Sequence, residues 1–404
     1  MKRMIKIIMI VLILAIFIVG GIYAYQKYQE YLEEERIRNA IVKIDYIDPL
    51  EIEFNEKIKL SDLIKSINGT LIDDFLIDTS IVGKREISFK YINEEDIRVP
   101  IKFTVSIVDK VPPVIWLNDT YKVTVGTDKR LEDMIMCADN YDDNPKCNII
   151  GGYDLKTIGD YDLVFEAVDQ SGNITKKNFT LKVAKKSSST SKTATIPFQS
   201  LYNEYKKNNT MIGIDVSKWQ GDINFEKVKE AGVEFAFIKV GGQNGLDKEY
   251  YVDSKFKRNI EGFKSVSIPV GLYFYSYANT EEKAYQDAMW VINEIKDYKI
   301  DLPIAFDWEN WSTYNRFHMS FNTLTKVANK FMNTLKEHGY DSMLYSSKNY
   351  LEQIWMPTSF PIWLAHYTSS TDYQGSFKCW QRTSSAKISG ITSNTVDFDI
   401  CYDE

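Results

Sequence analysis

The sequence predicts a multidomain protein that combines an N-terminal transmembrane helix, two all-β sandwich domains and an α/β barrel with incomplete helices, of the (β/α)5β3 kind. Three observations predict this fold class. Residues 7–25 form an uncharged apolar run, residues 41–183 alternate as β-strands do, and short apolar strands alternate with helical stretches from residue 211 onward. With 404 residues, the chain is long enough for several domains.

The apolar run at residues 7–25 is long enough to cross a bilayer core as a helix. Basic residues precede it and glutamates follow it, so the positive-inside rule predicts a cytoplasmic N-terminus and an extracellular remainder. A cleaved signal peptide is the alternative, although the run is longer than the apolar part of a usual signal peptide. We expect a cytoplasmic stub and membrane anchor over residues 1–26 and a charged stalk over residues 27–40.

The β-type region contains an internal repeat. Residues 77–83 parallel residues 153–159: the Asp-to-Gly spacing is the same in both, and a Phe follows the Gly at the same distance. A repeated turn and strand implies a repeated unit, so we expect two copies of one small β-sandwich that join near residues 109–113.

The second copy, residues 111–184, carries two motifs that suggest a known class of domain. Its residues 112–115 (PPVI) and 168–173 (VDQSGN) resemble the bacterial surface Ig-like domains. The first copy, residues 41–110, is more divergent. The resemblance implies a spacer or adhesion role without catalysis. Acidic residues within 139–143 suit calcium, but we interpret them as a solvated loop and expect no metal.

A stretch of Ser, Thr and Lys at residues 185–198 has nothing to bury and is interpreted as a linker. We therefore expect independent cores on its two sides. The net charge of the chain is −7, and this argues against a nucleic-acid partner because such partners are normally met by a basic face.

The four cysteines fall as two local pairs, Cys137 with Cys147 and Cys379 with Cys401. Neither spacing resembles a CxxC zinc pattern, so we expect two disulfides. Four buried free thiols remain the alternative, because spacing alone does not set disulfide geometry.

Residues 199–404 are expected to form the barrel. Helical stretches lie between the earlier strands and are missing between the last ones, so the closing strands lack full helices. The strand candidates are residues 212–216, 235–240, 270–275, 302–308, 342–345, 361–367, 378–382 and 396–400.

Acidic residues gather at the ends of these strands. Asp307 and Glu309 alternate on one strand and therefore point the same way, toward the barrel mouth. Asp215 ends the first strand, and Asp397 and Asp399 lie on the last, which is its neighbour in a closed barrel. We expect these carboxylates to converge at one rim.

Such a cluster either binds a metal or performs acid/base chemistry. His318, His338 and His366 show no metal-ligand spacing, so no metal is expected. Glycoside hydrolysis needs carboxylates alone, one protonated to donate to the leaving oxygen and one charged on the opposite face. The alternative is that these acids are caps and solvated rim groups.

The order and spacing of several motifs resemble the glycoside hydrolase family 25 lysozymes across nearly the whole barrel. The resemblance implies an eight-stranded barrel that cleaves the β-1,4 bond between N-acetylmuramic acid and N-acetylglucosamine with retention at the anomeric carbon. The motifs are residues 215–221 (DVSKWQG), 237–239 (FIK), 269–274 (PVGLYF), 307–309 (DWE), 363–367 (WLAHY), 380–381 (WQ) and 396–397 (VD).

The resemblance also implies roles for the acids. Glu309 matches the general acid of the family, Asp307 matches the partner that assists on the other face, and Asp215 and Asp397 match further acidic groups of the site. Asp307 either attacks carbon one or orients the acetamido group of the substrate, and its place two residues before the acid favours the second. Candidate substrate-binding residues, for which core packing is the alternative to sugar stacking, are Tyr273, Trp308, Trp363, Tyr367 and Gln381.

These expectations combine into a membrane-anchored peptidoglycan hydrolase. It would be a single-pass cell-membrane protein with a cytoplasmic N-terminus, and its catalytic domain would face the cell wall outside. Peptidoglycan glycan strands are the expected substrate, envelope proteins are possible partners of the Ig-like domains, and no cofactor or nucleic acid is expected. The alternative is a catalytically inactive wall-binding protein or adhesin.

Overall fold

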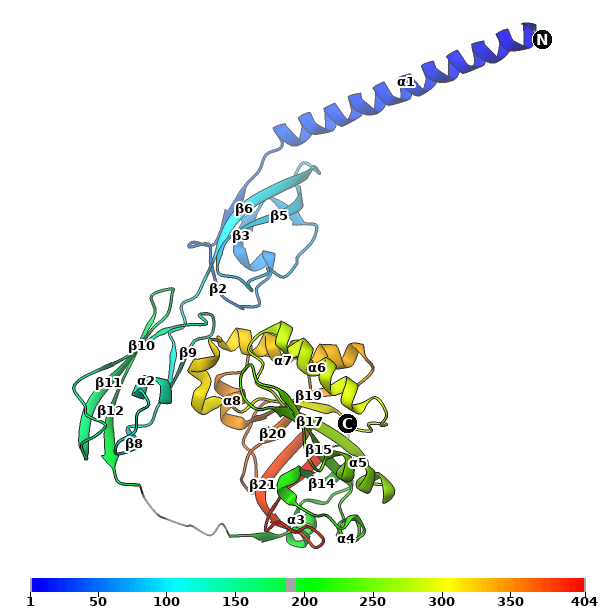
Figure 1. The fold of residues 1–404 in the computed structure, drawn as a ribbon. Helices are drawn as coiled ribbons and strands as arrows, with labels where there is room; N and C mark the ends of the chain where they lie inside the picture. The colour runs from blue at the N-terminus through cyan, green and yellow to red at the C-terminus, as the bar shows by residue number, and fades with distance from the viewer. Residues whose placement is uncertain (1, 187–193, 403–404) are drawn as a thin grey trace. The chain divides into compact units, whose positions relative to one another are not determined.

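The computed structural model describes residues 2–186 and 194–402 (Figure 1). The chain forms two compact units, Met1–Lys110 and Val111–Glu404. Residues 187–193 of the predicted linker lie outside the described residues. The end of that linker is not a free connection, because Ile196–Pro197 form strand β13, which pairs with the barrel strand β21 (Cys379–Lys387).

The N-terminal helix α1 covers Lys2–Asn39. Among the residues that the structure describes, no helix is long and apolar enough to cross a membrane. The predicted transmembrane helix at residues 7–25 is therefore wrong, and so is the predicted fold class that contained it. The prediction treated the apolar run on its own, whereas in the structure this run belongs to one helix that continues through the charged residues 27–39.

After α1, the first unit contains a four-stranded sheet and a two-stranded sheet. The larger sheet has the order β2-β6-β5-β4, and β1 pairs with β3 in the smaller one. The long β5–β6 hairpin provides much of the buried core. The elements are β1 (Ile44–Tyr46), β2 (Glu51–Glu53), η1 (Leu60–Leu63), β3 (Ile64–Ile67), β4 (Gly69–Leu71), β5 (Gly83–Asn93) and β6 (Arg98–Val108).

The second unit begins with a β domain, residues 111–184, that has the same topology. Its larger sheet has the order β10-β11-β12-β8, and β7 pairs with β9. In both copies the first strand of the larger sheet runs parallel to the last one, β2 with β6 and β8 with β12. The elements are β7 (Val114–Trp116), β8 (Thr120–Thr124), α2 (Leu131–Met134), β9 (Met136–Ala138), β10 (Lys146–Ile150), β11 (Gly159–Val168) and β12 (Ile174–Ala184).

The repeat in the sequence thus corresponds to a repeat in structure. Gly83 and Gly159, which end the repeated segments, begin the equivalent strands β5 and β11. The Ig-like character of the two copies is not confirmed. Each copy pairs four strands with a sheet of only two, whereas an Ig domain has at least seven strands in two larger sheets.

The rest of the second unit is a closed barrel. Its strands follow the order β21-β20-β19-β18-β17-β15-β14-β22, and β22 pairs back onto β21. All neighbours are parallel except at β22, which is antiparallel to both of its partners. The strands are β14 (Thr210–Val216), β15 (Phe235–Gln243), β17 (Val270–Tyr275), β18 (Ile304–Asp307), β19 (Ser342–Ser347), β20 (Ile362–Ala365), β21 and β22 (Val396–Tyr402).

Helices cover the outside of the barrel mainly between its first five strands (Figure 1). Two apolar layers result from the alternation of each strand: one layer packs the helices, and a smaller one fills the barrel interior around Phe237 and Trp363. The remaining elements are α3 (Phe198–Tyr205), η2 (Lys218–Gln220), α4 (Phe225–Glu230), β16 (Tyr250–Val252), α5 (Phe256–Ser265), α6 (Glu281–Ile295), η3 (Trp311–Phe317), α7 (Phe321–Glu337) and α8 (Lys348–Gln353).

The linker suggested that the β domain of residues 111–184 has a core independent of the barrel. The domain has a core of its own, but two of its strands also pack on the barrel. Met136 and Ala138 of β9 belong to the same buried cluster as the helical layer of the barrel, and Val114 and Trp116 of β7 pack against that cluster. The face of β7 and β9 that carries these residues is apolar, so it is buried against the barrel.

Both predicted disulfides are confirmed. Cys137 is bonded to Cys147, and Cys379 is bonded to Cys401. The second bond joins residues that lie directly opposite each other in the antiparallel pair β21–β22. It therefore fastens the end of the chain to the closing strands of the barrel.

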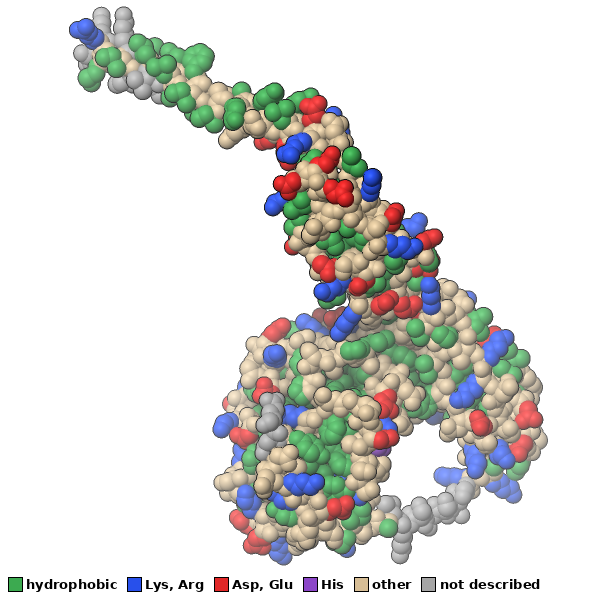
Figure 2. Space-filling model, turned by 180° about the vertical axis from the view of Figure 1, so that it is seen from behind, with side chains coloured by type: hydrophobic (Ala, Val, Ile, Leu, Met, Phe, Trp, Pro, Cys, Tyr) green, Lys and Arg blue, Asp and Glu red, His purple; other side chains and the backbone are tan. Residues whose placement is uncertain are grey.

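Surface charge is mixed. On the face that Figure 2 shows, Lys and Arg side chains are interspersed with Asp and Glu side chains. Over its described residues, this face offers no extended basic surface of the kind that nucleic acids require. The exclusion of a nucleic-acid partner stays a prediction from charge.

Candidate active site

Strand alternation directs two carboxylates into the mouth of the barrel. On β18, Ile304 and Phe306 belong to the helical layer, while Ala305 belongs to the interior layer. Asp307 continues the interior series at the end of the strand, and Glu309 continues it two residues later. Side chains two positions apart on a strand share a face, which is why both acids line one cavity.

This cavity has a volume of about 330 Å³ and contains all four predicted catalytic acids. Asp215 lies near the end of β14, and Asp397 lies directly opposite it on β22. Of the five predicted substrate-binding residues, four line the cavity: Tyr273, Trp363, Tyr367 and Gln381. The carboxyl ends of the parallel strands and the start of the antiparallel β22 therefore bring together residues that are up to 182 positions apart in the sequence, Asp215 to Asp397.

A larger cavity of about 690 Å³ lies at the opposite ends of the strands, around Pro361 and Lys378. These two residues directly precede β20 and β21. Its described lining contains no carboxylate. The larger cavity therefore lacks the pair of carboxyls that glycoside hydrolysis needs, and the candidate active site is the smaller, acidic one.

Gln381 organises one wall of the site. Its Nε2 donates to Oδ2 of Asp215 at 2.7 Å, and its Oε1 accepts from the hydroxyls of Tyr345 and Tyr367, both at 2.8 Å. The amide uses its donor and its acceptor at once, which fixes its orientation. It thereby holds Asp215 beside the cavity, and the network is buried apart from the half-exposed Tyr367.

Burial changes the protonation of these acids. Loss of hydration raises the pKa of Asp307 well above its usual range, and the nearby Glu309 charge raises it further. Burial also raises the pKa of Glu309, and the cation of Lys239 opposes both shifts. Burial and the Asp215 charge raise the pKa of Asp397 to about 9. Two carboxylates in one cavity cannot both ionise as readily as isolated ones, so this arrangement favours the state in which the pair of Asp307 and Glu309 holds one proton.

Asp399 adds a further buried carboxyl below the site. It is fully buried, and its Oδ1 accepts a hydrogen bond from Nε1 of Trp363 at 2.9 Å. Burial raises its pKa well above the usual range, and the charge of Asp397 adds to that shift. Asp399 therefore fixes the ring of Trp363, which lines the cavity, rather than lining the cavity itself.

The structure places Trp308 away from the site. Its side chain is fully buried in the helical layer, where its ring lies 4.8 Å from that of Trp311 and 5.0 Å from that of Phe317. The reason is the same alternation that brings Asp307 and Glu309 together: the residue between them must point to the other face. Trp308 is therefore a packing residue and not a sugar-stacking one.

Five further residues line the cavity besides the four acids and the four substrate-binding residues. Lys239 is the most important of them, because its positive charge lowers the pKa of both Asp307 and Glu309. Its Nζ lies 4.8 Å from the ring centre of Tyr275. Alternation along β15 could have found it, since Phe235 and Phe237 face the interior and Lys239 is next in that series. The other four of these lining residues are Ser217, Trp219, Tyr275 and Tyr345.

Comparison with known proteins shows what this barrel is similar to. Residues 214–391 match the glycosyl hydrolases family 25. This part of the chain is similar to the family 25 glycosyl hydrolases. The match covers the strands that carry Asp215, Asp307 and Gln381 and ends before β22, which carries Asp397.

Two curated lysozymes are similar to part of the chain. The chain is 30% identical over 192 residues to the autolytic lysozyme of Clostridium acetobutylicum, which covers 47% of this chain and 55% of that protein. It is 27% identical over 196 residues to lysozyme M1 of Streptomyces globisporus, which covers 45% of this chain and 65% of that protein. The chain thus spans between about half and two thirds of the length of these relatives.

Among solved structures, the modular autolysin LytC from Streptococcus pneumoniae, in complex with a synthetic peptidoglycan ligand, has a TM-score of 0.44 and 25% sequence identity. The similarity covers 59% of this chain and 56% of that one.

Proposed function

We propose that this protein is an extracellular peptidoglycan hydrolase that cleaves the β-1,4 bond between N-acetylmuramic acid and N-acetylglucosamine with retention at the anomeric carbon. The observation that carries the proposal is the pair of carboxyls that line one cavity of the barrel, the buried Asp307 at the end of β18 and Glu309 two residues beyond it. The lysozyme relatives support the substrate class.

Glu309 is the general acid in this proposal. A general acid must hold a proton near neutral pH and release it to the leaving oxygen as the glycosidic bond breaks. Burial raises the pKa of Glu309, which favours the protonated form. The Lys239 cation opposes that shift, so it would stabilise the carboxylate that remains after the proton has been given up.

Asp307 assists on the other face of the sugar. Among the described residues, its buried Oδ1 has no hydrogen-bond partner. An acetamido N–H of the substrate would give this oxygen a donor and would stabilise the charged form of Asp307. The shared proton would then reside on Glu309 when substrate is bound. The unpartnered oxygen is the reason to favour assistance by the acetamido group over direct attack by Asp307.

The two disulfides support a location outside the cytoplasm. Such bonds form and persist in oxidising compartments and are rare where thiols are kept reduced. Cell-wall glycan lies in the same compartment as the proposed catalytic domain. Location and substrate are therefore consistent with each other.

The experiment that tests the proposal is digestion of purified peptidoglycan followed by mass spectrometry of the soluble products. A muramidase leaves N-acetylmuramic acid at the new reducing end. Products with N-acetylglucosamine at the reducing end would mean that a different bond is cut. Binding to the wall without any soluble product would instead favour the inactive wall-binding protein.

A further inference from the structure

The segment that follows the catalytic acid is held from outside the barrel. Residues 310–320 connect Glu309 to helix α7, and they include the short helix η3. The backbone of this segment is irregular: Thr313 leaves the helical conformation inside η3, and His318 has a φ of 51°, in the left-handed region that residues other than Gly rarely adopt. Such a segment depends on contacts with its surroundings to keep one conformation.

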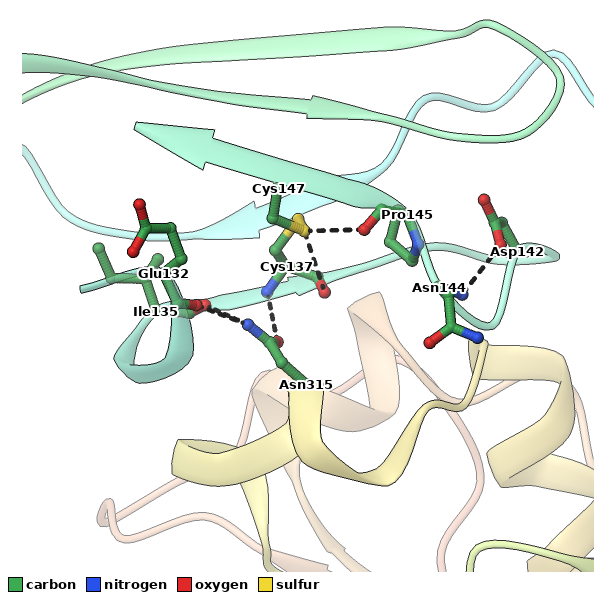
Figure 3. Close-up of a disulfide and its surroundings, with 8 residues drawn as sticks. All are labelled: Glu132, Ile135, Cys137, Asp142, Asn144, Pro145, Cys147 and Asn315. Carbon is green, nitrogen blue, oxygen red and sulfur yellow. Dashed lines mark hydrogen bonds between the residues drawn. A yellow bond between two sulfur atoms is a disulfide. The ribbon is translucent and has the colours of Figure 1, made fainter. Parts of the chain in front are cut away.

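Asn315 supplies the first of these contacts (Figure 3). Its Oδ1 accepts from the backbone N–H of Cys137 at 2.9 Å. Its Nδ2 donates to the backbone carbonyls of Glu132 at 2.9 Å and Ile135 at 2.8 Å. One side chain from η3 thus bonds three backbone groups of the β domain of residues 111–184. The residue that donates to Asn315, Cys137, is also the one whose sulfur forms the disulfide to Cys147.

The same β domain caps helix α7. Oδ1 of Asp143 accepts from the backbone N–H of Ser320 at 2.6 Å and from the hydroxyl of Thr323 at 2.7 Å. The backbone carbonyls of residues 139 and 140 accept from the N–H groups of Phe321 and Asn322. The first N–H groups of a helix have no partner within it, and a carboxylate is favourable there. The β domain therefore fixes the far end of the segment as well as its middle.

A row of aromatic rings connects the β domain to the catalytic strand. Trp116 of β7 lies 5.1 Å from the ring centre of Tyr350, and Tyr350 stacks on Trp311 at 3.9 Å. Trp311 in turn lies 4.8 Å from Trp308, the residue between Asp307 and Glu309. Interiors packed in this way transmit small displacements, because side chains cannot shift without moving their neighbours.

We infer that the β domain of residues 111–184 positions the general acid, and that Asn315 is the positioning residue through which it acts. This inference rests on the proposed function of Glu309. A displacement of about 1 Å at a catalytic group can cost about 10²-fold in rate. Asn315 does not line the cavity, so it affects where Glu309 is held and not how the glycan binds.

The test compares Asn315→Ala with the matched control Asn148→Ala in the full chain. Asn148 is an exposed residue of β10 in the same β domain. Kinetics on soluble glycan fragments should show that Asn315→Ala lowers kcat by about tenfold, with KM changed less than about twofold, because only positioning in the transition state is lost. The control should retain the kcat of the unaltered protein. Thermal melting shows whether each variant is fully folded at the assay temperature, even where its melting temperature is lower.

An Asn315→Ala variant with unchanged kcat would overturn the inference. A loss of kcat that comes with an equal rise in KM, or that disappears when rates are normalised to the fraction of folded protein at the assay temperature, would reveal a merely structural contact and would overturn it too. If Asn315→Ala does not fold, Asp143→Ala removes the cap of α7 from an exposed loop and is judged by the same kinetic criteria. Inert unaltered protein would instead contradict the proposed function, so the two failures are distinguishable.

Discussion

At the scale of single residues, alternation along strands decides which side chains can do chemistry. It was sufficient to predict from the sequence that Asp307 and Glu309 share a face, and the structure places both in one cavity with Asp215 and Asp397. Applied consistently, the same rule would have excluded Trp308 and included Lys239. The hydrogen-bond network of Gln381 could not be predicted, because its partners are as far as 166 residues away.

The first residue-scale prediction concerns Glu309→Gln. The amide keeps the size of the side chain but cannot donate an acidic proton, so the rate of wall hydrolysis should fall by about 10² to 10⁴. The melting temperature should stay close to that of the unaltered protein. Turnover assays and thermal melting measure the two effects. Near-normal turnover with a normal melting curve would mean that another group is the general acid.

The second residue-scale prediction concerns pH. A general acid works only while it is protonated, so activity should fall as pH rises through the pKa of Glu309. Burial raises that pKa, so the fall should occur at a higher pH than an ordinary glutamate would give. A Lys239→Met variant removes the cation that opposes the shift. The alkaline limb of its pH–activity profile, where activity falls, should therefore lie at still higher pH. A limb that moves the other way would contradict the assigned effect of Lys239.

At the scale of elements, the barrel strands could be predicted because short apolar runs are regularly separated by helical stretches. What the sequence does not reveal is how a helix holds the loop beside the site. Asp287 of α6 is fully buried, and it accepts from the hydroxyl of Ser276 at 2.5 Å and from that of Tyr250 at 2.7 Å. The backbone of Ser276 in turn accepts from the side chain of Asn310 and donates to the carbonyl of Asp307. Helix α6 thus supports the end of the catalytic strand.

This network gives a prediction about stability. Burial raises the pKa of Asp287 to about 6 from an ordinary value of 3.8. Between these values the folded state binds the proton more tightly than the unfolded state, so this group favours folding at low pH and loses that contribution as pH rises to about 6. Asp287→Asn does not titrate. The free energy of unfolding can be measured with denaturant from pH 4 to 7. As pH rises, that of the unaltered protein should fall relative to that of Asp287→Asn. Parallel curves would contradict this prediction.

At the scale of the whole molecule, composition predicted a linker but not what the linker connects. The sequence suggested independent cores on the two sides of residues 185–198. In the structure, Met136 and Ala138 lie in the core of the barrel, and Asn315 bonds backbone groups that are 178 to 183 positions earlier in the chain. Contacts at such separations leave no local pattern, because they depend on how two completed domains pack.

The last prediction follows from this shared core. A fragment that begins at Ile196 lacks the β domain, so it should expose the apolar surface that Met136, Ala138 and Trp116 cover, and it should lose the hydrogen bonds to Asn315. Each of these bonds is worth about 1 kcal/mol. The fragment that begins at Ile196 should melt several degrees lower than one that begins at Val111, and it should release muropeptides more slowly. Calorimetry and wall digestion measure both effects. Equal melting temperatures and equal rates would show that the barrel is independent after all, as the linker alone suggested.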